Sequence, residues 1–214
     1  MDLDGRRVKP KGNLELDIIK NTLPKGAREY VRLNSTGFID QELINSANIT
    51  SSQNFNNLLT LVNSSEIIEV ESNNSFIYLD QEGNIGKETM SYIPFDCNFP
   101  EDKDVDFKYV NGLSTGEMGL FGTVLFPDKD GLQNSTNNNI KIIINSSLSL
   151  LGAAESFSHE GYGHALLYVI NGGNHDGASH NLKSTPHGPY DSNETLKKMI
   201  LNSRKETVNN FNQR

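Results

Sequence analysis

The first third of the chain places its apolar residues at roughly helical intervals. This pattern occurs in "LELDIIKNTL" (14–23), "FIDQELINSA" (38–47) and "SQNFNNLLTLVNSS" (52–65), and it is typical of helices that bury one face. Pro24, Lys25 and Gly26 end the first of these segments, since proline and glycine break helices. The sequence therefore predicts a helical portion over residues 14–64.

The pattern then becomes that of β-strands. "SEIIEVES" (65–72) and "SFIYLDQEGNIGKETMSYI" (75–93) are β-rich, and the turn residues Asn73-Asn74 and Glu82-Gly83-Asn84 suggest hairpins. Two further strands are expected within "GEMGLFGTVLFPDKDG" (116–131) and "NNNIKIIINSS" (137–147). The second contains Ile142, Ile143 and Ile144 in succession, which fits a strand buried on both faces.

The longest predicted helix follows the isoleucine-rich strand. It runs from Leu150 to Ile170 and ends before Gly172-Gly173. An amphipathic helix over 192–211 closes the chain. We therefore expect an α+β fold in which a small mixed sheet packs on the long helix. Residues 1–13 are expected to form a linker and 14–214 one domain, with its sheet and catalytic part over 65–214.

The long helix contains "SHEGYGHALLYV" (158–169), in which His159 is followed by Glu160 and, five residues later, by His164. Zinc peptidases of the His-Glu-x-x-His type place two histidines four residues apart on one helix face, with the glutamate as general base. On a regular α-helix, residues five apart are separated by about 140° of arc. A π-bulge adds one residue to a turn and realigns them. The sequence thus predicts a π-bulge over Gly161 to Gly163.

Two glycines in this turn require an explanation, because each costs roughly 1 kcal/mol relative to alanine in a helix interior. Gly161 and Gly163 are expected to ease the backbone distortion and the approach of a substrate chain. The alternative is a helix whose two histidines are core or surface residues without a metal.

A catalytic zinc ion usually takes three protein ligands and leaves one position for water. Cys97 is the only cysteine, so the ligands must be His, Asp or Glu. His159 and His164 supply two. Among later residues His180 is favoured as the third because the chain needs several residues to return along the helix, with His175 as the alternative; Asp176, His187 and Glu194 are weaker candidates.

The chemistry of such a site follows from Zn²⁺ and the glutamate. Zinc lowers the pKa of a bound water and polarises the scissile carbonyl, while Glu160 would remove the proton of the water and pass it to the leaving amine. Glu155 lies one turn before His159, so it could orient that ligand, bind the metal itself, or simply be a solvated residue of the helix surface. Tyr162 and Tyr190 are weaker candidates for an oxyanion donor.

Charge and composition limit the possible partners. The formal net charge is −8 and the pI is about 5.1, which disfavours nucleic acid and anionic membranes as general partners. The first residues carry charges where a signal peptide has an apolar core, and no apolar run is long enough to span a bilayer. We expect synthesis in the cytoplasm without a signal peptide.

Two stretches resemble known families. "HEGYGH" resembles the His-Glu-x-x-Gly-His motif of dipeptidyl peptidase III-type metallopeptidases, although the downstream glutamate motif of that family is not seen. "MDLDGRRVKPKG" resembles the Asp-Pro-Asp-Gly junction that closes the core of bacterial Rhs (YD-repeat) proteins, with Leu3 in place of proline. The body of the chain is also similar to metallopeptidase domains found at the ends of such proteins.

The resemblance implies a function for the whole domain. In Rhs proteins the junction is followed by a variable C-terminal toxin. The chain would then be a zincin-like zinc metallopeptidase, a toxin or effector in interbacterial competition, exported as part of an Rhs protein. Its partners would be a protein or peptide substrate and a cognate immunity protein.

Two other functions remain open at this stage. His180-Asn181 and His187 could form a His-Asn-His nuclease core, although the acidic balance disfavours DNA as the substrate. The domain could also be a non-catalytic module that binds metal or a host protein. Glu160 argues against the latter, because a structural metal site needs no base beside its ligands.

Overall fold

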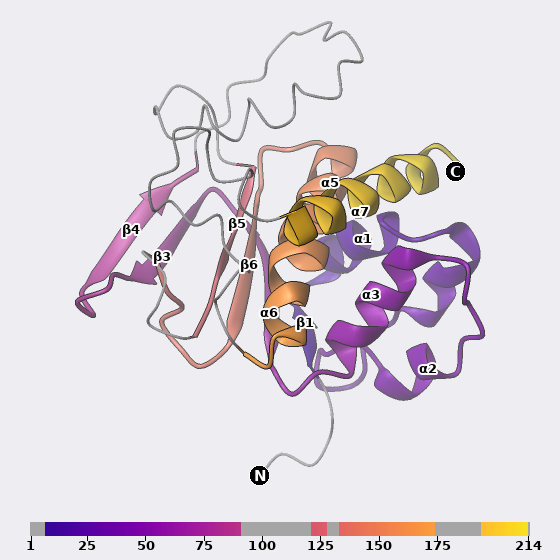
Figure 1. The fold of residues 1–214 in the computed structure, drawn as a ribbon, viewed down its shortest axis with the longest axis horizontal. Coiled ribbons are helices and arrows are strands. Elements are labelled where there is room, and N and C mark those ends of the chain that lie inside the picture. Colours follow the sequence, from indigo (N-terminus) through magenta and orange to yellow (C-terminus); the bar gives the residue numbers. More distant parts are fainter. Residues whose placement is uncertain (1–6, 91–120, 128–132, 174–193, 214) are drawn as a thin grey trace, which may run out of the picture.

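The computed structural model describes residues 7–90, 121–127, 133–173 and 194–213 (Figure 1). In this part of the chain most of the strands lie together in sequence, between a helical N-terminal portion and a helical C-terminal portion, so that the fold is α+β, as the sequence predicts. The elements are β1 (Val8–Pro10), α1 (Asn13–Asn21), the 3₁₀ helix η1 (Lys25–Tyr30), α2 (Gln41–Asn45), α3 (Gln53–Val62), β2 (Ile68–Asn73), β3 (Ser75–Leu79), β4 (Ile85–Thr89), β5 (Gly122–Leu125), β6 (Ile140–Asn145), α5 (Leu150–His159), the π-helix η3 (Glu160–Ala165), α6 (Leu166–Ile170) and α7 (Glu194–Asn212).

The predicted N-terminal helices are confirmed, and local chemistry explains where they begin. The side chain of Asp40 accepts a hydrogen bond from the backbone N–H of Leu43 at the start of α2. Ser52 accepts one from the N–H of Phe55 at the start of α3. Both are N-cap interactions, which satisfy backbone donors that have no partner inside the helix. The apolar faces of α1 and α3 then enter the core.

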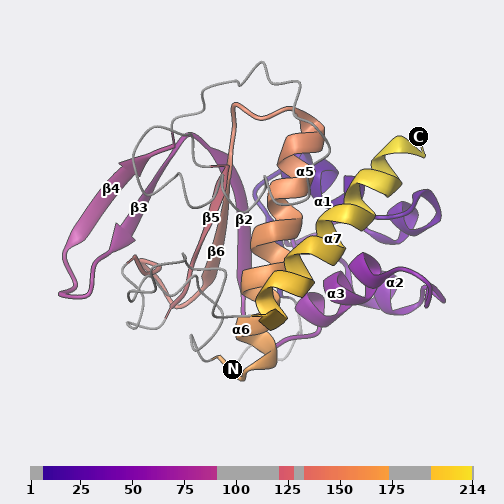
Figure 2. The ribbon, with the colours of Figure 1, turned by 45° about the horizontal axis from the view of Figure 1, so that its top comes forward.

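A four-stranded mixed sheet has the order β1-β2-β6-β5. Strands β1, β2 and β6 are parallel, and β5 runs antiparallel to β6 at the edge. Helices α1, α3, α5 and α7 all lie to one side of this sheet (Figures 1 and 2). The expectation of a small mixed sheet packed on the long helix is confirmed.

The isoleucine-rich strand is buried on both faces, as predicted. Ile142 and Ile144 of β6 belong to the main core, whereas Ile143 belongs to a smaller cluster with Phe76, Met90 and Leu125. That second cluster forms where the hairpin of β3 and β4 packs on the sheet. The central position of β6, together with the cover from the hairpin, explains why this strand lacks the alternation of a half-buried one.

Nothing in the local sequence predicts β1. Val8–Pro10 belongs to the segment expected to be a linker, yet it pairs with β2, and Val8 is fully buried. Pro10 is compatible with this place because β1 is an edge strand, where a residue without an N–H leaves no ladder bond unmade. Residues 8–10 are therefore part of the folded sheet.

One of the two suggested hairpins is confirmed and the other is wrong. Strands β3 and β4 pair antiparallel around the turn at residues 80–84, in which Gly83 has a φ of 85°. No hairpin forms at Asn73-Asn74, because β2 is already paired with β1 on one side and β6 on the other. The chain instead leaves the main sheet there and begins the separate two-stranded sheet.

The predicted long helix spans Leu150 to Ile170 as α5, η3 and α6 in direct succession. Ser149 caps its start by accepting a hydrogen bond from the N–H of Gly152. Gly172 and Gly173 follow its end with φ values of 70° and 80°, the left-handed conformation in which helices commonly terminate. The predicted C-terminal helix is present as α7, which lies across this long helix (Figure 2). No helix in the described ranges has the length and apolar character needed to cross a membrane.

Candidate metal centre

The predicted π-bulge is confirmed. Residues Glu160–Ala165 form a π-helical segment between two α-helical ones. It contains both glycines and ends just after the second histidine. All six residues of this segment are buried, so the extra residue is accommodated within the core of the protein.

The distortion brings the two histidine rings together. The Nε2 atoms of His159 and His164 are 3.2 Å apart, and the ring centroids are 5.1 Å apart. Two imidazole nitrogens bound to one tetrahedral zinc ion, each at about 2.05 Å, would be separated by about 3.3 Å. The spacing therefore fits a shared ion. In the metal-free protein the same spacing allows an N–H···N hydrogen bond between the rings.

Glu160 completes this group. The three side chains offer ligand atoms that all lie within 4.8 Å of one another. The Glu160 side chain is buried, and burial raises the pKa of its carboxyl to about 8. A raised pKa means that the carboxylate form of this side chain would be a stronger proton acceptor than an exposed glutamate. A nearby cation would lower this pKa by favouring the charged form.

Gly122 of the edge strand β5 is a member of the site that the motif alone does not reveal. A Cβ placed on Gly122 would lie 2.4 Å from Ser156 Oγ and 3.1 Å from Glu160 Cγ. Ser156 in turn donates a hydrogen bond to the carbonyl of Phe121 at 3.0 Å. The start of β5 thus lies directly against the helix turn that carries Glu160. A glycine inside a strand pattern is the one sequence signal for such close approach.

The two glycines of the π-segment have a different use from the one expected. A Cβ on Gly163 would lie 2.5 Å from Ile200 Cγ1, and a Cβ on Gly161 would lie 3.0 Å from the ring of Phe157. Both residues are buried and have no positive φ. They therefore permit close packing of α7 and of Phe157, and the expectation that they open the site to a substrate chain is wrong.

Tyr162 is not placed to serve as an oxyanion donor. Its side chain is fully buried, and its hydroxyl forms a 2.8 Å hydrogen bond with Thr22 Oγ1 of the C-terminal end of α1. Its ring meets that of Phe157 edge to face, with centroids 5.2 Å apart. Desolvation raises the pKa of this phenol. Tyr162 is a core residue, and Tyr190 lies outside the described residues.

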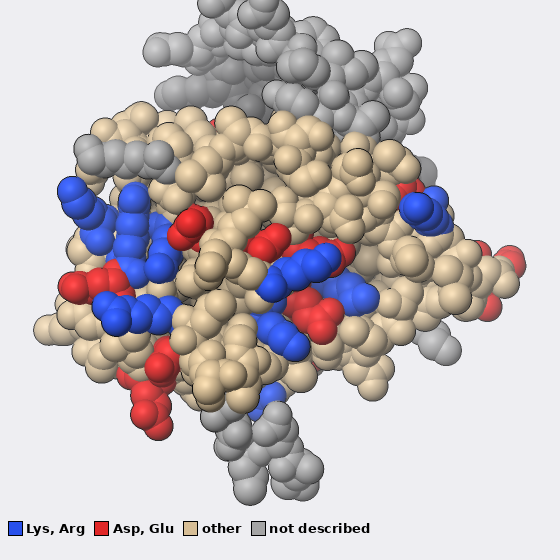
Figure 3. Space-filling view, turned by 180° about the vertical axis from the view of Figure 1, so that it is seen from behind, with Lys and Arg blue, Asp and Glu red and all other residues tan. Residues whose placement is uncertain are grey.

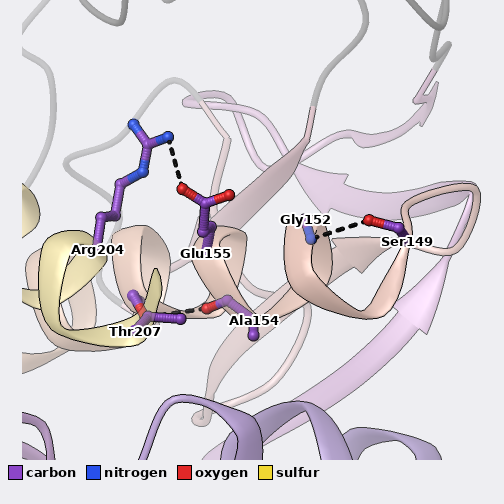
Figure 4. A network of polar contacts seen from close by, with 7 residues as sticks. Ser149, Gly152, Ala154, Glu155, Arg204 and Thr207 are labelled. Carbon is purple, nitrogen blue, oxygen red and sulfur yellow. Dashed lines mark hydrogen bonds and ion pairs between the residues drawn. The ribbon is translucent and has the colours of Figure 1, made fainter. Parts of the chain in front are cut away.

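Glu155 forms an ion pair with Arg204 of α7, at 3.3 Å between Oε1 and Nη2 (Figure 4). Its carboxylate does not belong to the group formed by His159, Glu160 and His164 among the described residues. Direct binding of the metal by Glu155 is thus not supported. The role of orienting His159 remains a prediction.

The remaining candidates lie in a part of the chain that the structure does not describe. His175, Asp176, His180 and His187 fall within residues 174–193, as do the nuclease candidates His180-Asn181. Glu194 begins α7, but its side chain is not described. The third ligand therefore stays a prediction, with His180 first and His175 second.

Comparisons of the chain with protein-family models, with curated proteins and with solved structures found no match. The functional argument consequently rests on the chemistry of the site itself.

Proposed function

We propose that this protein is a zinc-dependent peptidase with a zincin-like domain. The observation that carries the proposal is the pair of imidazole nitrogens 3.2 Å apart beside the buried carboxyl of Glu160. Two histidines and a glutamate on one helix turn are the ligands and the base that the reaction requires. A structural zinc site would have no use for a buried carboxyl that is poised to exchange a proton.

Each residue has a distinct role in this proposal. His159 and His164 would hold the zinc ion, together with His180 or His175. When bound, zinc makes water acidic and polarises a carbonyl group. Glu160 accepts a proton from the attacking water and passes it to the leaving amine. Burial raises the pKa of its carboxyl toward neutral pH, so that its carboxylate can both take up and release this proton.

The edge strand supports a peptide as the substrate. Within the described residues β5 pairs along one side only, with β6, and its first residue lies next to Glu160. An extended peptide can bind to such an edge through main-chain hydrogen bonds. Its peptide bonds would then pass close to the base.

The sequence at the N-terminus supports a biological setting. Because "MDLDGRRVKPKG" resembles the junction of Rhs proteins, we propose that the domain is the C-terminal toxin of such an effector, exported with it, and that a cognate immunity protein binds it. A nucleic-acid substrate is not favoured. The chain carries a net charge of −8, and on the face seen in Figure 3 basic side chains lie beside acidic ones.

The test is expression in bacterial cells that lack the immunity protein. Glu160→Gln should abolish growth inhibition and peptide-bond hydrolysis while the protein still binds zinc, since the amide cannot accept the proton. Glu71→Gln is the matched control and should remain as toxic as the wild type, because this half-buried glutamate of β2 pairs with Lys11 and does not belong to the histidine group. Undiminished toxicity of Glu160→Gln would contradict the proposal.

A further inference from the structure

The inserted turn of the π-segment is held by one buried hydrogen bond to a distant helix. Tyr162 is fully buried, and its hydroxyl lies 2.8 Å from Thr22 Oγ1. The Thr22 hydroxyl donates its own proton to the carbonyl of Ile19 at 2.7 Å. A hydroxyl has a single hydrogen to donate, so Tyr162 must be the donor in its bond to Thr22. The direction of this bond is therefore fixed.

The position of Thr22 is fixed from several sides. Its carbonyl accepts hydrogen bonds from Asn54 Nδ2 at 3.0 Å and from Asn210 Nδ2 at 2.9 Å. These donors come from α3 and α7. The acceptor that Tyr162 reaches is consequently tied to three helices, and it provides a rigid anchor point on the core side of the π-segment.

Tyr162 lies midway between Glu160 and His164 in the chain. Its side chain points into the core, while the flanking Glu160 and His164 side chains converge with His159. A regular helix would separate the two histidines by about 140°. An interaction that holds the Tyr162 side chain against α1 therefore also supports the backbone conformation that brings the two histidines together.

We propose that Tyr162 is a positioning residue for the metal site, and that its hydrogen bond to Thr22 keeps the π-segment in the register that brings His159 and His164 onto one ion. This inference rests on the proposed zinc function. It assigns to Tyr162 no contact with the metal or with a substrate.

The test measures zinc affinity of the full chain by competition with a chromophoric chelator, using zinc alone as the ligand. Tyr162→Phe keeps the ring and removes the hydroxyl, and Thr22→Val removes the acceptor. Each should weaken zinc binding by about tenfold or more, the range found when groups that orient metal ligands are lost. The double variant should bind zinc no more weakly than the weaker-binding single variant. Thr22→Ser, which keeps the hydroxyl, should bind zinc as tightly as the wild type.

Ser203→Ala is the matched control. Ser203 of α7 is fully buried, and its hydroxyl accepts a hydrogen bond from Asn57 Nδ2 at 3.2 Å, so the bond that is lost involves neither Tyr162 nor Thr22. Its loss should lower the resistance to urea, as Tyr162→Phe does, but leave the zinc affinity and the absorption spectrum of the cobalt-substituted protein unchanged. Tyr162→Phe should alter that spectrum.

Three outcomes would overturn the inference. In the first, Tyr162→Phe binds zinc as tightly as the wild type, which leaves the proposed peptidase intact. In the second, Ser203→Ala loses as much affinity as Tyr162→Phe, so that the effect is one of general stability. In the third, the wild type binds no zinc, which also rejects the proposed function.

Discussion

The buried carboxyl of Glu160 makes the metal-free protein sensitive to pH in a way that one substitution can isolate. Burial raises the pKa of Glu160 from 4.5 to about 8. The folded state therefore holds this proton more tightly than the unfolded state does. The protonated carboxyl contributes fully to the free energy of unfolding below pH 4.5, and this contribution is lost as the pH rises through about 8.

The magnitude follows from the size of the shift. A difference of one pKa unit corresponds to about 1.4 kcal/mol, so the rise to about 8 corresponds to a loss of up to about 5 kcal/mol between pH 4.5 and pH 9. A typical domain is stabilised by about 5–15 kcal/mol in total, so this loss would remove a large part of its free energy of unfolding. Glu160→Gln is neutral at every pH and should escape this loss.

The assay is urea unfolding followed by circular dichroism in a chelator at pH 5, 7 and 9. Glu160→Gln and the wild type should be similar at pH 5, and the variant should become more stable by several kcal/mol at pH 9. Zinc should remove the difference, because a cation stabilises the carboxylate. Glu71→Gln controls for the loss of one acidic side chain at a half-buried site, where the carboxylate is paired with Lys11 at 3.2 Å. A stability difference that does not change with pH would refute the burial argument.

Three further predictions concern the packing around the site. Gly163→Ala should lower the free energy of unfolding by about 1–3 kcal/mol, since its Cβ would lie 2.5 Å from Ile200 Cγ1; urea unfolding should show partial recovery when Ile200→Ala is added. Gly122→Ala should reduce peptidase activity more than zinc affinity, because its Cβ would lie 2.4 Å from Ser156 Oγ and 3.1 Å from Glu160 Cγ and so displace the turn that carries Glu160; assays of both quantities on one preparation check this. Arg204→Ala should cost about 1–3 kcal/mol, because both side chains of its ion pair with Glu155 are only about a quarter exposed and the substitution removes this partner of the carboxylate; metal analysis should show the zinc content unchanged.

The sequence predicts the central feature of the site because helix geometry permits only one solution. Two histidines five residues apart cannot meet on a regular helix, so a shared ion requires the π-segment that the structure contains. The long helix and the isoleucine-rich strand are predicted for a related reason. Their patterns are long and regular enough to outweigh local ambiguity.

The features that the sequence does not predict depend on contacts between distant segments. Strand β1 is three residues long and pairs with a strand some 60 positions later in the chain, such as Val8 with Ile68. The turn residues Asn73-Asn74 show that the chain bends, but they cannot show which strand already occupies the edges of β2. Likewise, neither Thr22 nor Tyr162 has a local signal for their hydrogen bond.

The use of the glycines is a third case of this kind. Local reasoning shows that Gly161 and Gly163 need a compensating gain. The gain comes from close contact with Phe157 and with Ile200 of α7. The second partner lies on a helix whose position follows only from the complete fold.

The most direct test of the metal site is elemental analysis of protein purified without a chelator. We predict one zinc ion per wild-type chain and its loss in both His159→Ala and His164→Ala, while Glu160→Gln retains it. A metal-free wild type, or a His164→Ala variant that keeps its zinc, would contradict the proposal that the π-segment builds a two-histidine metal site.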